Sequence, residues 1–328
     1  MALKQDILRM LEERRGESVS GAQMADTLDV TRSAVWKAVK ALQDEGHQIE
    51  AGTNRGYCLK TSSDVLSVPS IQKGLKTQRM GRSIFLYKTL DSTNIEAKRL
   101  AQEGAEHGTV VLAEEQTAGR GRMGHSFYSP KQAGIYMSVI LRPKLKPEEY
   151  LLFTCAAAVA AARAVASLYG IECSIKWIND LFVGKKKVGG IMTEASMNFE
   201  DGRFDYVVIG IGLNVSTSGG QFGRELRCTA TSLQAASGRK DIFRTELIAE
   251  ILNQLEMIEA AFEEKTFFAE YKRRLFLLGQ RVDVQDDWGV ETVTALDIDE
   301  HARLIVQCPD GGIKKLQASQ VHVRLHQE

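Results

Sequence analysis

Two arginines lie between glycines in residues 114–130, which read EEQTAGRGRMGHSFYSP. The guanidinium groups of Arg120 and Arg122 suit the oxygens of phosphates and carboxylates, because each presents several donors in one plane. Residues 119–124 also fit the pattern G-x-G-x-x-G, but a dinucleotide site requires a helix directly afterwards, and here Ser-Phe-Tyr-Ser-Pro follows. A plain solvated hairpin is the alternative. We predict a loop that is mobile when empty and becomes ordered around an anion.

Four further stretches carry groups that could assist such chemistry. Residues 91–94, DSTN, begin an expected helix, where hydroxyls and free N–H groups can bind a carboxylate or an amide ring. Asp180 in IKWIND lies at a strand end and could orient a nucleophile or a metal. In the turn GKKK, Lys187 could point inward, whereas Lys185 and Lys186 are expected to be exposed. The glycines of VGG and IGIGLNV would let a ligand approach the backbone. A simple helix cap and a solvated hairpin tip are the alternatives for DSTN and the lysines.

These stretches are separated by strands and helices from residue 83 onward. The expected strands are residues 83–90, 109–115, 134–141, 173–177, 181–183, 188–197 and 204–215. The expected helices are residues 91–104, residues 151–169 and an amphipathic pair within 241–276. Thr93 and Glu96 have the spacing of a capping box for the first of these helices. The pattern predicts a mixed α/β domain.

The end of the chain has a different pattern. Residues 281–325 contain five short runs of alternating polar and apolar residues, separated by turn sequences such as PDGG. Short alternating runs at this spacing are typical of a small β barrel or sandwich.

The first 60 residues read as three helices and a hairpin. Ser20 precedes the second helix as a capping residue, and Thr31 precedes the third, TRSAVWKAVKALQDEG. Residues 61–82 are polar and lack a period, so we predict a linker there.

The third helix has a basic outer face, since residues 31–43 include three basic side chains and no acidic one. A helix-turn-helix from Gly21 to Lys40 would present this face to the major groove of DNA, and a hairpin turn at residues 53–56 would bring Arg55 to the phosphates as a wing. The expected DNA-binding residues are Thr31, Arg32, Ser33, Trp36, Lys37, Lys40 and Arg55. The alternative is a solvated module that binds protein or nothing.

The composition narrows the classes of protein to which this sequence can belong. The 328 residues carry 42 basic and 42 acidic side chains, so DNA binding has to rest on a local patch. Five scattered cysteines without a CxxC pair are typical of reduced thiols in a cytoplasmic protein without a zinc site. The charged beginning, MALKQDILRMLEE, lacks the apolar core of a signal peptide. Residues 151–169 are apolar but contain an arginine, so we expect a buried helix and no membrane span.

The motifs DSTN, EEQTAGRGRMG, KWIND, GKKKVGG and GIGLNV follow one another across residues 91–215, and this order resembles the biotin–protein ligase family. With a helix-turn-helix in front, the chain resembles the bifunctional class, which combines a biotin ligase with a biotin-operon repressor. The resemblance implies a multidomain α+β fold. Its expected parts are a winged helix-turn-helix (1–65), a ligase domain similar to class II aminoacyl-tRNA synthetases (66–276) and an SH3-like β barrel (277–328).

The resemblance also implies a two-step reaction. The carboxylate of biotin attacks the α-phosphate of ATP in the presence of Mg²⁺, giving biotinyl-5′-AMP and pyrophosphate. The ε-amine of a lysine on a biotin carboxyl carrier protein, part of a biotin-dependent carboxylase, then attacks the mixed anhydride. The adenylate would also act as corepressor, because the adenylate-bound homodimer is expected to bind operator DNA and repress operons for biotin biosynthesis or transport. No metal site formed by the protein alone is expected.

Residue roles follow from the same resemblance. Arg120, Arg122 and Lys187 would neutralise the carboxylate and the α-phosphate, and Asp180 would orient the incoming amine. The expected biotin-binding residues are Ser92, Thr93, Asn94, Gln116, Arg120, Gly121, Arg122, Lys187, Gly190 and Gly212. The expected ATP- and adenylate-binding residues are Arg122, Phe127, Lys187 and Asn214.

Three residues depart from the usual pattern of the family. Ile178 stands where the family usually has proline, His125 where it has arginine and Phe127 where it has tryptophan. His125 therefore carries a pH-dependent charge in place of a permanent one. Phe127 keeps an aromatic face but lacks the indole donor.

Three other functions stay open. A lipoate-type ligase would run the same chemistry on another acid. A biotin ligase could carry a vestigial helix-turn-helix. A regulator could bind an adenylate and sense it without catalysing any reaction.

Overall fold

The computed structural model describes residues 2–52, 55–144, 149–198, 202–286 and 289–326. The chain divides into two compact units. The N-terminal unit comprises Met1–Lys76 and Phe243–Glu250, and the larger unit comprises Thr77–Ile242 and Ile251–Glu328.

The N-terminal unit contains the three helices and the hairpin that the sequence predicts. The helices are α1 (Ala2–Glu13), α2 (Gly21–Thr27) and α3 (Arg32–Asp44). The strands are β1 (Ser18–Val19), β2 (Ile49–Gly52) and β3 (Gly56–Leu59), in the order β1-β3-β2. The hydroxyls of Ser20 and Thr31 accept from the backbone N–H groups of Ala22 and Ala34, which confirms both helix caps. Of the hairpin turn at residues 53–56, Thr53 and Asn54 lie outside the described residues.

The predicted linker over residues 61–82 is wrong in its middle, where α4 (Val68–Gly74) forms. Ser67 caps this helix by accepting from the N–H of Ser70, and Pro69 lies in the first turn, where it suits a helix. Ile71 is fully buried. A helix of seven residues with one buried apolar face is too short to show a clear period in the sequence.

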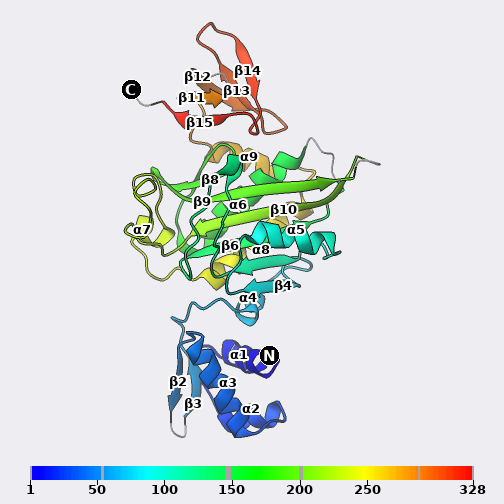
Figure 1. Ribbon diagram of the computed structural model, residues 1–328, viewed down its shortest axis with the longest axis vertical. Coiled ribbons are helices and arrows are strands. Elements are labelled where there is room, and N and C mark those ends of the chain that lie inside the picture. Colours follow the sequence, from blue (N-terminus) through cyan, green and yellow to red (C-terminus); the bar gives the residue numbers. More distant parts are fainter. Residues whose placement is uncertain (1, 53–54, 145–148, 199–201, 287–288, 327–328) are drawn as a thin grey trace. The chain divides into compact units, whose positions relative to one another are not determined.

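The larger unit is built on a seven-stranded sheet of order β4-β5-β6-β10-β9-β8-β7 (Figure 1). Its strands are β4 (Ile84–Tyr87), β5 (Val110–Ala113), β6 (Gly134–Leu141), β7 (Ser174–Lys176), β8 (Asp180–Val183), β9 (Lys186–Met197) and β10 (Phe204–Asn214). β4 and β5 are parallel, and the other neighbours are antiparallel. All seven predicted strands are present, with shorter bounds at several ends.

Helices cover both faces of this sheet. α5 (Thr93–Gln102) packs against β5, β6 and β10, and α6 (Tyr150–Tyr169) packs against β8, β9 and β10. Further helices are α7 (Leu233–Ser237), α8 (Arg244–Ala260), which belongs partly to each unit, and α9 (Thr266–Arg274), which contacts α6 and β7. On β9, Glu194 contacts α5 and Thr193 contacts α6. Adjacent strand residues point to opposite faces, so α5 and α6 lie on opposite sides of the sheet.

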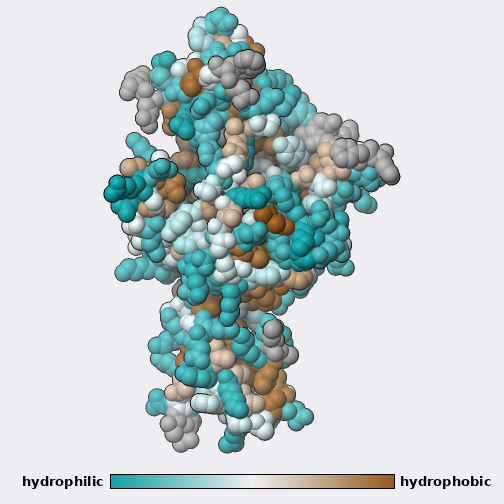
Figure 2. Space-filling model, viewed as in Figure 1, coloured by the Kyte–Doolittle hydropathy of each residue, from teal (hydrophilic) through white to brown (hydrophobic). Residues whose placement is uncertain are grey.

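Helix α6 is long and apolar enough to cross a membrane, but 72% of its most apolar window is buried inside the protein. It packs against β9, β10 and α9. The prediction of a buried core helix is therefore confirmed. The face of the molecule shown in Figure 2 is mostly hydrophilic, with apolar residues scattered over it.

The predicted capping box of α5 is wrong. The N-cap position is Ser92, whose side chain makes no capping hydrogen bond, so Thr93 is the first residue of the helix. The Thr93 hydroxyl is directed to the side chain of Gln116 instead of its own helix, at 3.1 Å. Glu96 accepts from the hydroxyl of Tyr87 at 2.6 Å, and this contact across to β4 replaces the expected local one.

The end of the chain forms a five-stranded antiparallel sheet of order β14-β13-β12-β11-β15. Its strands are β11 (Arg281–Asp286), β12 (Gly289–Ile298), β13 (Leu304–Gln307), β14 (Ile313–Leu316) and β15 (His322–Leu325). The predicted small β domain is confirmed, and its five strands match the form of an SH3-like domain. It contacts the turn between β7 and β8, since the indole N–H of Trp177 donates to the carbonyl of Ala302 at 2.9 Å.

Candidate functional site

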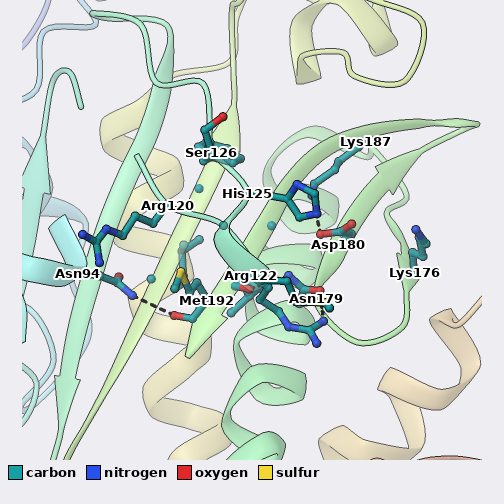
Figure 3. A pocket seen from close by; sticks show the side chains of 18 of the residues that line it. Asn94, Arg120, Arg122, His125, Ser126, Lys176, Asn179, Asp180, Lys187 and Met192 are labelled. Carbon is teal, nitrogen blue, oxygen red and sulfur yellow. Dashed lines mark hydrogen bonds and ion pairs between the residues drawn. The ribbon is translucent and has the colours of Figure 1, made fainter. Parts of the chain in front are cut away.

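A cavity of about 380 Å³ lies in the larger unit, a size typical of small-molecule sites. The ten residues predicted to bind biotin all line it: Ser92, Thr93, Asn94, Gln116, Arg120, Gly121, Arg122, Lys187, Gly190 and Gly212. Asp180 and Phe127 line it as well. Figure 3 shows the side chains that converge there from the arginine loop, from α5 and from strands β7 to β9. Residues more than 100 positions apart in the chain thus form one wall.

The arginine loop is folded as a tight hairpin. The N–H of Gly121 donates to the carbonyl of His125 at 2.7 Å, and the N–H of Phe127 donates to the carbonyl of Gly119 at 2.8 Å. Between them, η1 (Arg122–Gly124) is a single 3₁₀ turn. This backbone frame directs Arg122 toward the cavity.

Arg122 is the more enclosed of the two arginines. Its Nη1 donates to Oδ1 of Asn179 at 3.0 Å (Figure 3). Its Nη2 donates to the carbonyl of Ala318 in the C-terminal sheet domain. Burial lowers the pKa of Arg122, and the Asp180 carboxylate opposes this shift. Arg120 is exposed on the cavity rim. The site therefore holds one partly desolvated cation and one in contact with solvent.

Lys187 and Asp180 form an ion pair at 2.6 Å on the cavity wall (Figure 3). Their side chains are 34% and 19% exposed, so the pair is neither fully buried nor freely solvated. Lys187 lines the cavity while Lys185 and Lys186 are exposed, as the sequence predicts. The turn that carries Asp180 is held in place, because Asn179 Nδ2 donates to the carbonyl of Ile191 at 2.9 Å.

Ile178, which stands where the related family usually has proline, is buried. The peptide bond between Trp177 and Ile178 is cis. The carbonyl of Ile178 accepts from the hydroxyl of Tyr271 at 2.8 Å. This turn is thus buried and hydrogen-bonded to α9.

Neutral polar groups occupy the opposite corner of the cavity. Ser92, Thr93 and Asn94 are all buried, and Gln116 accepts from the N–H of Thr93 at 2.8 Å. Side chains that combine donors and acceptors without a charge suit an amide or a urea better than an anion.

Phe127 closes another part of the wall. Its ring lies so near Gly212 that a Cβ atom on that residue would be 2.7 Å from Cε1 of the ring. It also makes an edge contact with Tyr136, at 6.4 Å between centroids. Asn214 lies outside the set of described lining residues; its Nδ2 donates to the carbonyl of Thr231 at 3.1 Å. Its buried Oδ1 has no hydrogen-bond partner among the described residues.

Sequence reasoning missed several lining residues. Lys176, His322 and Arg324 add a second group of basic side chains to the wall. Burial lowers the pKa of Lys176, and nearby Lys187 adds to this shift. Burial also lowers the pKa of His322 to about 4, with Lys176, Arg324 and His125 adding to the effect. The position of Lys176 in KWIND was a usable signal, but no local pattern marks β15 as part of a site.

Metal ligands are sparse in the site. Among the described lining residues, Asp180 is the one carboxylate, and it is already paired with Lys187. The part of the chain that the structure describes contains no group of three His, Cys, Asp or Glu side chains placed to hold a metal ion.

The basic face of the N-terminal unit is open to solvent. All predicted DNA-binding residues are exposed: Thr31, Arg32, Ser33, Trp36, Lys37, Lys40 and Arg55. Trp36 is 56% exposed, which is unusual for so large an apolar side chain. A helix with this face, held by a buried stripe of Val35 and Val39, can enter a groove without rearranging its core.

Comparisons with known proteins agree with both regions. The model of the Biotin/lipoate A/B protein ligase family matches residues 86–214, and the model of an HTH domain matches residues 4–58. The bifunctional ligase/repressor BirA of Bacillus spizizenii and that of Bacillus subtilis are each 35% identical over 327 residues, covering 98% of this chain and 98% of each relative. The structure of the biotin protein ligase of Aquifex aeolicus, solved with biotin and ATP, matches with a TM-score of 0.64 and 27% identity. That match covers 75% of this chain and 100% of the other.

Proposed function

This chain belongs to the family of the bifunctional ligase/repressor BirA proteins, and we propose that it joins biotin to a protein lysine at the expense of ATP and represses transcription through its N-terminal unit. One observation carries the ligase proposal. A single cavity combines two arginines, a lysine–aspartate pair and a corner of neutral donors and acceptors. This combination suits an acid with a urea ring and a phosphate next to its carboxylate.

In the first step, an oxygen of the biotin carboxylate attacks the α-phosphorus of ATP, and the bond to the pyrophosphate leaving group breaks. Two negative groups must approach each other, so fixed cations lower the barrier most. Arg120, Arg122 and Lys187 take this role at the cavity wall. The partly desolvated position of Arg122 strengthens its interaction with a phosphate oxygen.

Mg²⁺ would neutralise phosphate charge when it enters with ATP. Asp180 is the one carboxylate of the described wall that could approach it, which agrees with an ion held chiefly by the phosphates of its nucleotide.

In the second step, the lysine amine of the carrier protein attacks the carbonyl carbon of the anhydride and AMP leaves. Asp180 orients this amine, and its present partner Lys187 shows that the carboxylate accepts an ammonium group at 2.6 Å. Phe127 offers a stacking face for adenine. Asn214, whose Oδ1 has no partner among the described residues, is assigned to the nucleotide side, although it needs a shift to reach the cavity.

The arginine loop gives the ligase its link to regulation. The loop is expected to open for biotin and ATP and to close on the adenylate, which keeps water from the anhydride. Biotinyl-5′-AMP then acts as corepressor, the closed loop favours a homodimer, and two copies of α3 read operator DNA. We place this activity in the cytoplasm, with domains at 1–65, 66–276 and 277–328 and a biotin carboxyl carrier protein as acceptor.

Exchange of labelled pyrophosphate into ATP tests the ligase proposal. Exchange that requires biotin, with lipoate inactive, is the expected result. Exchange with lipoate alone would assign the protein to the lipoate-type ligases. Absence of exchange with either acid would favour a sensor without catalysis.

Binding to DNA selected from a random pool with the adenylate-loaded protein tests the repressor proposal. Affinity should fall steeply with salt, and Arg32→Ala should weaken binding while Arg9→Ala should not. Arg9 is a matched control, because it is exposed on α1 and pairs with Asp6. Equally weak DNA binding by the wild type, Arg32→Ala and Arg9→Ala would indicate a vestigial helix-turn-helix.

A further inference from the structure

A continuous chain of hydrogen bonds lies behind the neutral corner of the cavity. At one end, Nδ2 of Asn94 donates to Oε2 of Glu194 at 2.8 Å and, over a longer distance of 3.3 Å, to the backbone carbonyl of Met192. Oδ1 of Asn94 accepts from the hydroxyl of Ser138 at 2.6 Å, and the same hydroxyl lies 2.8 Å from Oγ1 of Thr93. The N–H and the hydroxyl of Thr93 donate to Oε1 of Gln116 at 2.8 and 3.1 Å.

The chain continues from Gln116 into the arginine loop. Nε2 of Gln116 donates to the hydroxyl of Ser129 at 2.8 Å, and Ser129 donates to the carbonyl of Phe127 at 3.0 Å. The chain therefore connects β9 and β6 with the segment that carries both arginines.

Its members fall into two layers. Thr93, Asn94 and Gln116 line the cavity. Ser138 and Glu194 lie outside the set of described lining residues, and Ser138 is completely buried.

The sheet leaves room for this arrangement. Gly210 pairs with Ser138 across β10 and β6, and a Cβ atom on Gly210 would lie 2.2 Å from Oδ1 of Asn94. Any other residue at this position would displace the amide of Asn94.

At both ends of this hydrogen-bond chain lies a group that can only accept hydrogen bonds. Because the Glu194 carboxylate and the more distant Met192 carbonyl have no proton to give, the amide of Asn94 must turn its Nδ2 toward them and its Oδ1 toward Ser138. Because the Phe127 carbonyl takes the proton of Ser129, Gln116 must turn its Nε2 to Ser129 and its Oε1 toward Thr93. The orientation of each amide is thus set from outside the cavity.

The middle of this hydrogen-bond chain has fewer hydroxyl protons than contacts between neighbouring oxygen atoms. Three contacts join Asn94 Oδ1, Ser138, Thr93 and Gln116 Oε1, and the two hydroxyls supply one proton each. An amide oxygen has two lone pairs. Among the described residues, Asn94 Oδ1 accepts from Ser138 alone and keeps a free lone pair whichever way the hydroxyls point, whereas Gln116 Oε1 also accepts from the N–H of Thr93 and keeps one only when the Thr93 hydroxyl points to Ser138. A ring N–H of a cyclic urea can donate to such a free lone pair, whereas a dithiolane ring has no N–H to offer.

We propose that Ser138 and Glu194 are positioning residues that set the polarity of Asn94, Thr93 and Gln116 and thereby select a cyclic urea. This inference rests on the proposed biotin ligase function. It adds specificity determinants in a layer that does not touch the ligand.

Glu194→Gln and Lys98→Met form the first test. Nζ of Lys98 pairs with Oε1 of Glu194 at 2.6 Å, so both variants remove the same ion pair. Only Glu194→Gln puts a group that can donate beside Asn94, which leaves the longer contact with the Met192 carbonyl, at 3.3 Å, as the acceptor that holds its Nδ2. We expect the KM for biotin to rise about tenfold in Glu194→Gln and to stay within about twofold in Lys98→Met. In both, kcat and the KM for ATP should remain unchanged in pyrophosphate exchange.

Ser138→Ala and Ser138→Cys form the second test. The alanine variant should raise the KM for biotin about tenfold to a hundredfold, and the cysteine variant less, since a thiol is a weak donor of similar size. Desthiobiotin keeps the urea but lacks the sulfur ring, and its KM should rise by the same factor. A purely structural role would instead lower kcat and raise the KM for ATP.

The outcomes distinguish a failure of this inference from a failure of the proposed ligase function. Equal biotin KM values in Glu194→Gln and Lys98→Met, in a wild type that exchanges with biotin, would overturn this inference alone. A wild type without biotin-dependent exchange would overturn the proposed function and the inference together. If Ser138→Ala does not fold, the first pair still decides, because Glu194 and Lys98 are 24% and 31% exposed and tolerate substitution.

Discussion

Replacement of Lys187 by methionine should separate catalysis from stability at this site. Methionine matches the apolar stem of lysine but lacks the terminal ammonium group and its charge. Removal of one group that stabilises transition-state charge typically costs about a hundredfold to a thousandfold in rate, or about 3 to 4 kcal/mol. Lys187 lines the cavity and reaches Asp180 at 2.6 Å, so its ammonium group is held in the wall where the proposed reaction would take place.

The effect on folding should be much smaller. With side chains 34% and 19% exposed, the pair of Lys187 and Asp180 is screened by solvent and contributes about 1 kcal/mol or less. In a unit of this size that corresponds to a fall in Tm of about 2 to 4 °C. A large loss of rate with a small loss of Tm is therefore the expected signature.

The lysine turn supplies matched controls. Lys185→Met and Lys186→Met remove the same charge one or two residues away, and both side chains are exposed. Biotin-dependent pyrophosphate exchange should be within about twofold of wild type in these variants and fall about a hundredfold or more in Lys187→Met. A folded Lys187→Met protein with exchange within threefold of Lys186→Met would refute the role of this lysine in charge neutralisation.

Three further predictions concern the loop, the nucleotide side and pH. Arg122→Ala should release bound adenylate about tenfold or more faster than wild type in a single-turnover filtration assay, since it removes charge-assisted hydrogen bonds; release at the wild-type rate would contradict the retention role. Gly212→Ala should displace the Phe127 ring, from which its Cβ would lie 2.7 Å, and raise the KM for ATP about tenfold. An unchanged KM would show that this ring does not stack on adenine. The pKa of His322 is about 4 when folded and ordinarily 6.5, so the unfolded chain binds the proton first and stability falls as pH drops from 6.5 to 4. His322→Gln should make that fall shallower by about 1 kcal/mol or less, because the ring is partly exposed, and parallel Tm curves against pH would contradict this.

Local chemistry made much of the fold predictable. Ser20 and Thr31 precede helices with a hydroxyl in the right place, and both cap them as expected. The strands and helices around the cavity also follow from patterns within a few residues. The prediction of a capping box at Thr93 is wrong because the Thr93 hydroxyl donates to Gln116 on another segment. Local spacing in the sequence does not reveal this partner.

The sequence by itself determined the residue types of the site and the family they resemble, because motifs in a loop or at a strand end keep their chemistry wherever they lie. The tertiary structure decided which distant groups complete the wall. Arg122 contacts the carbonyl of Ala318, 196 positions away, and His322 reaches the same cavity from the last strand. Ser138, in an apolar strand, became a candidate only when the sheet placed it between Thr93 and Asn94. Contacts of this kind depend on how sheets and helices pack, and packing is a property of the whole chain that no local period records.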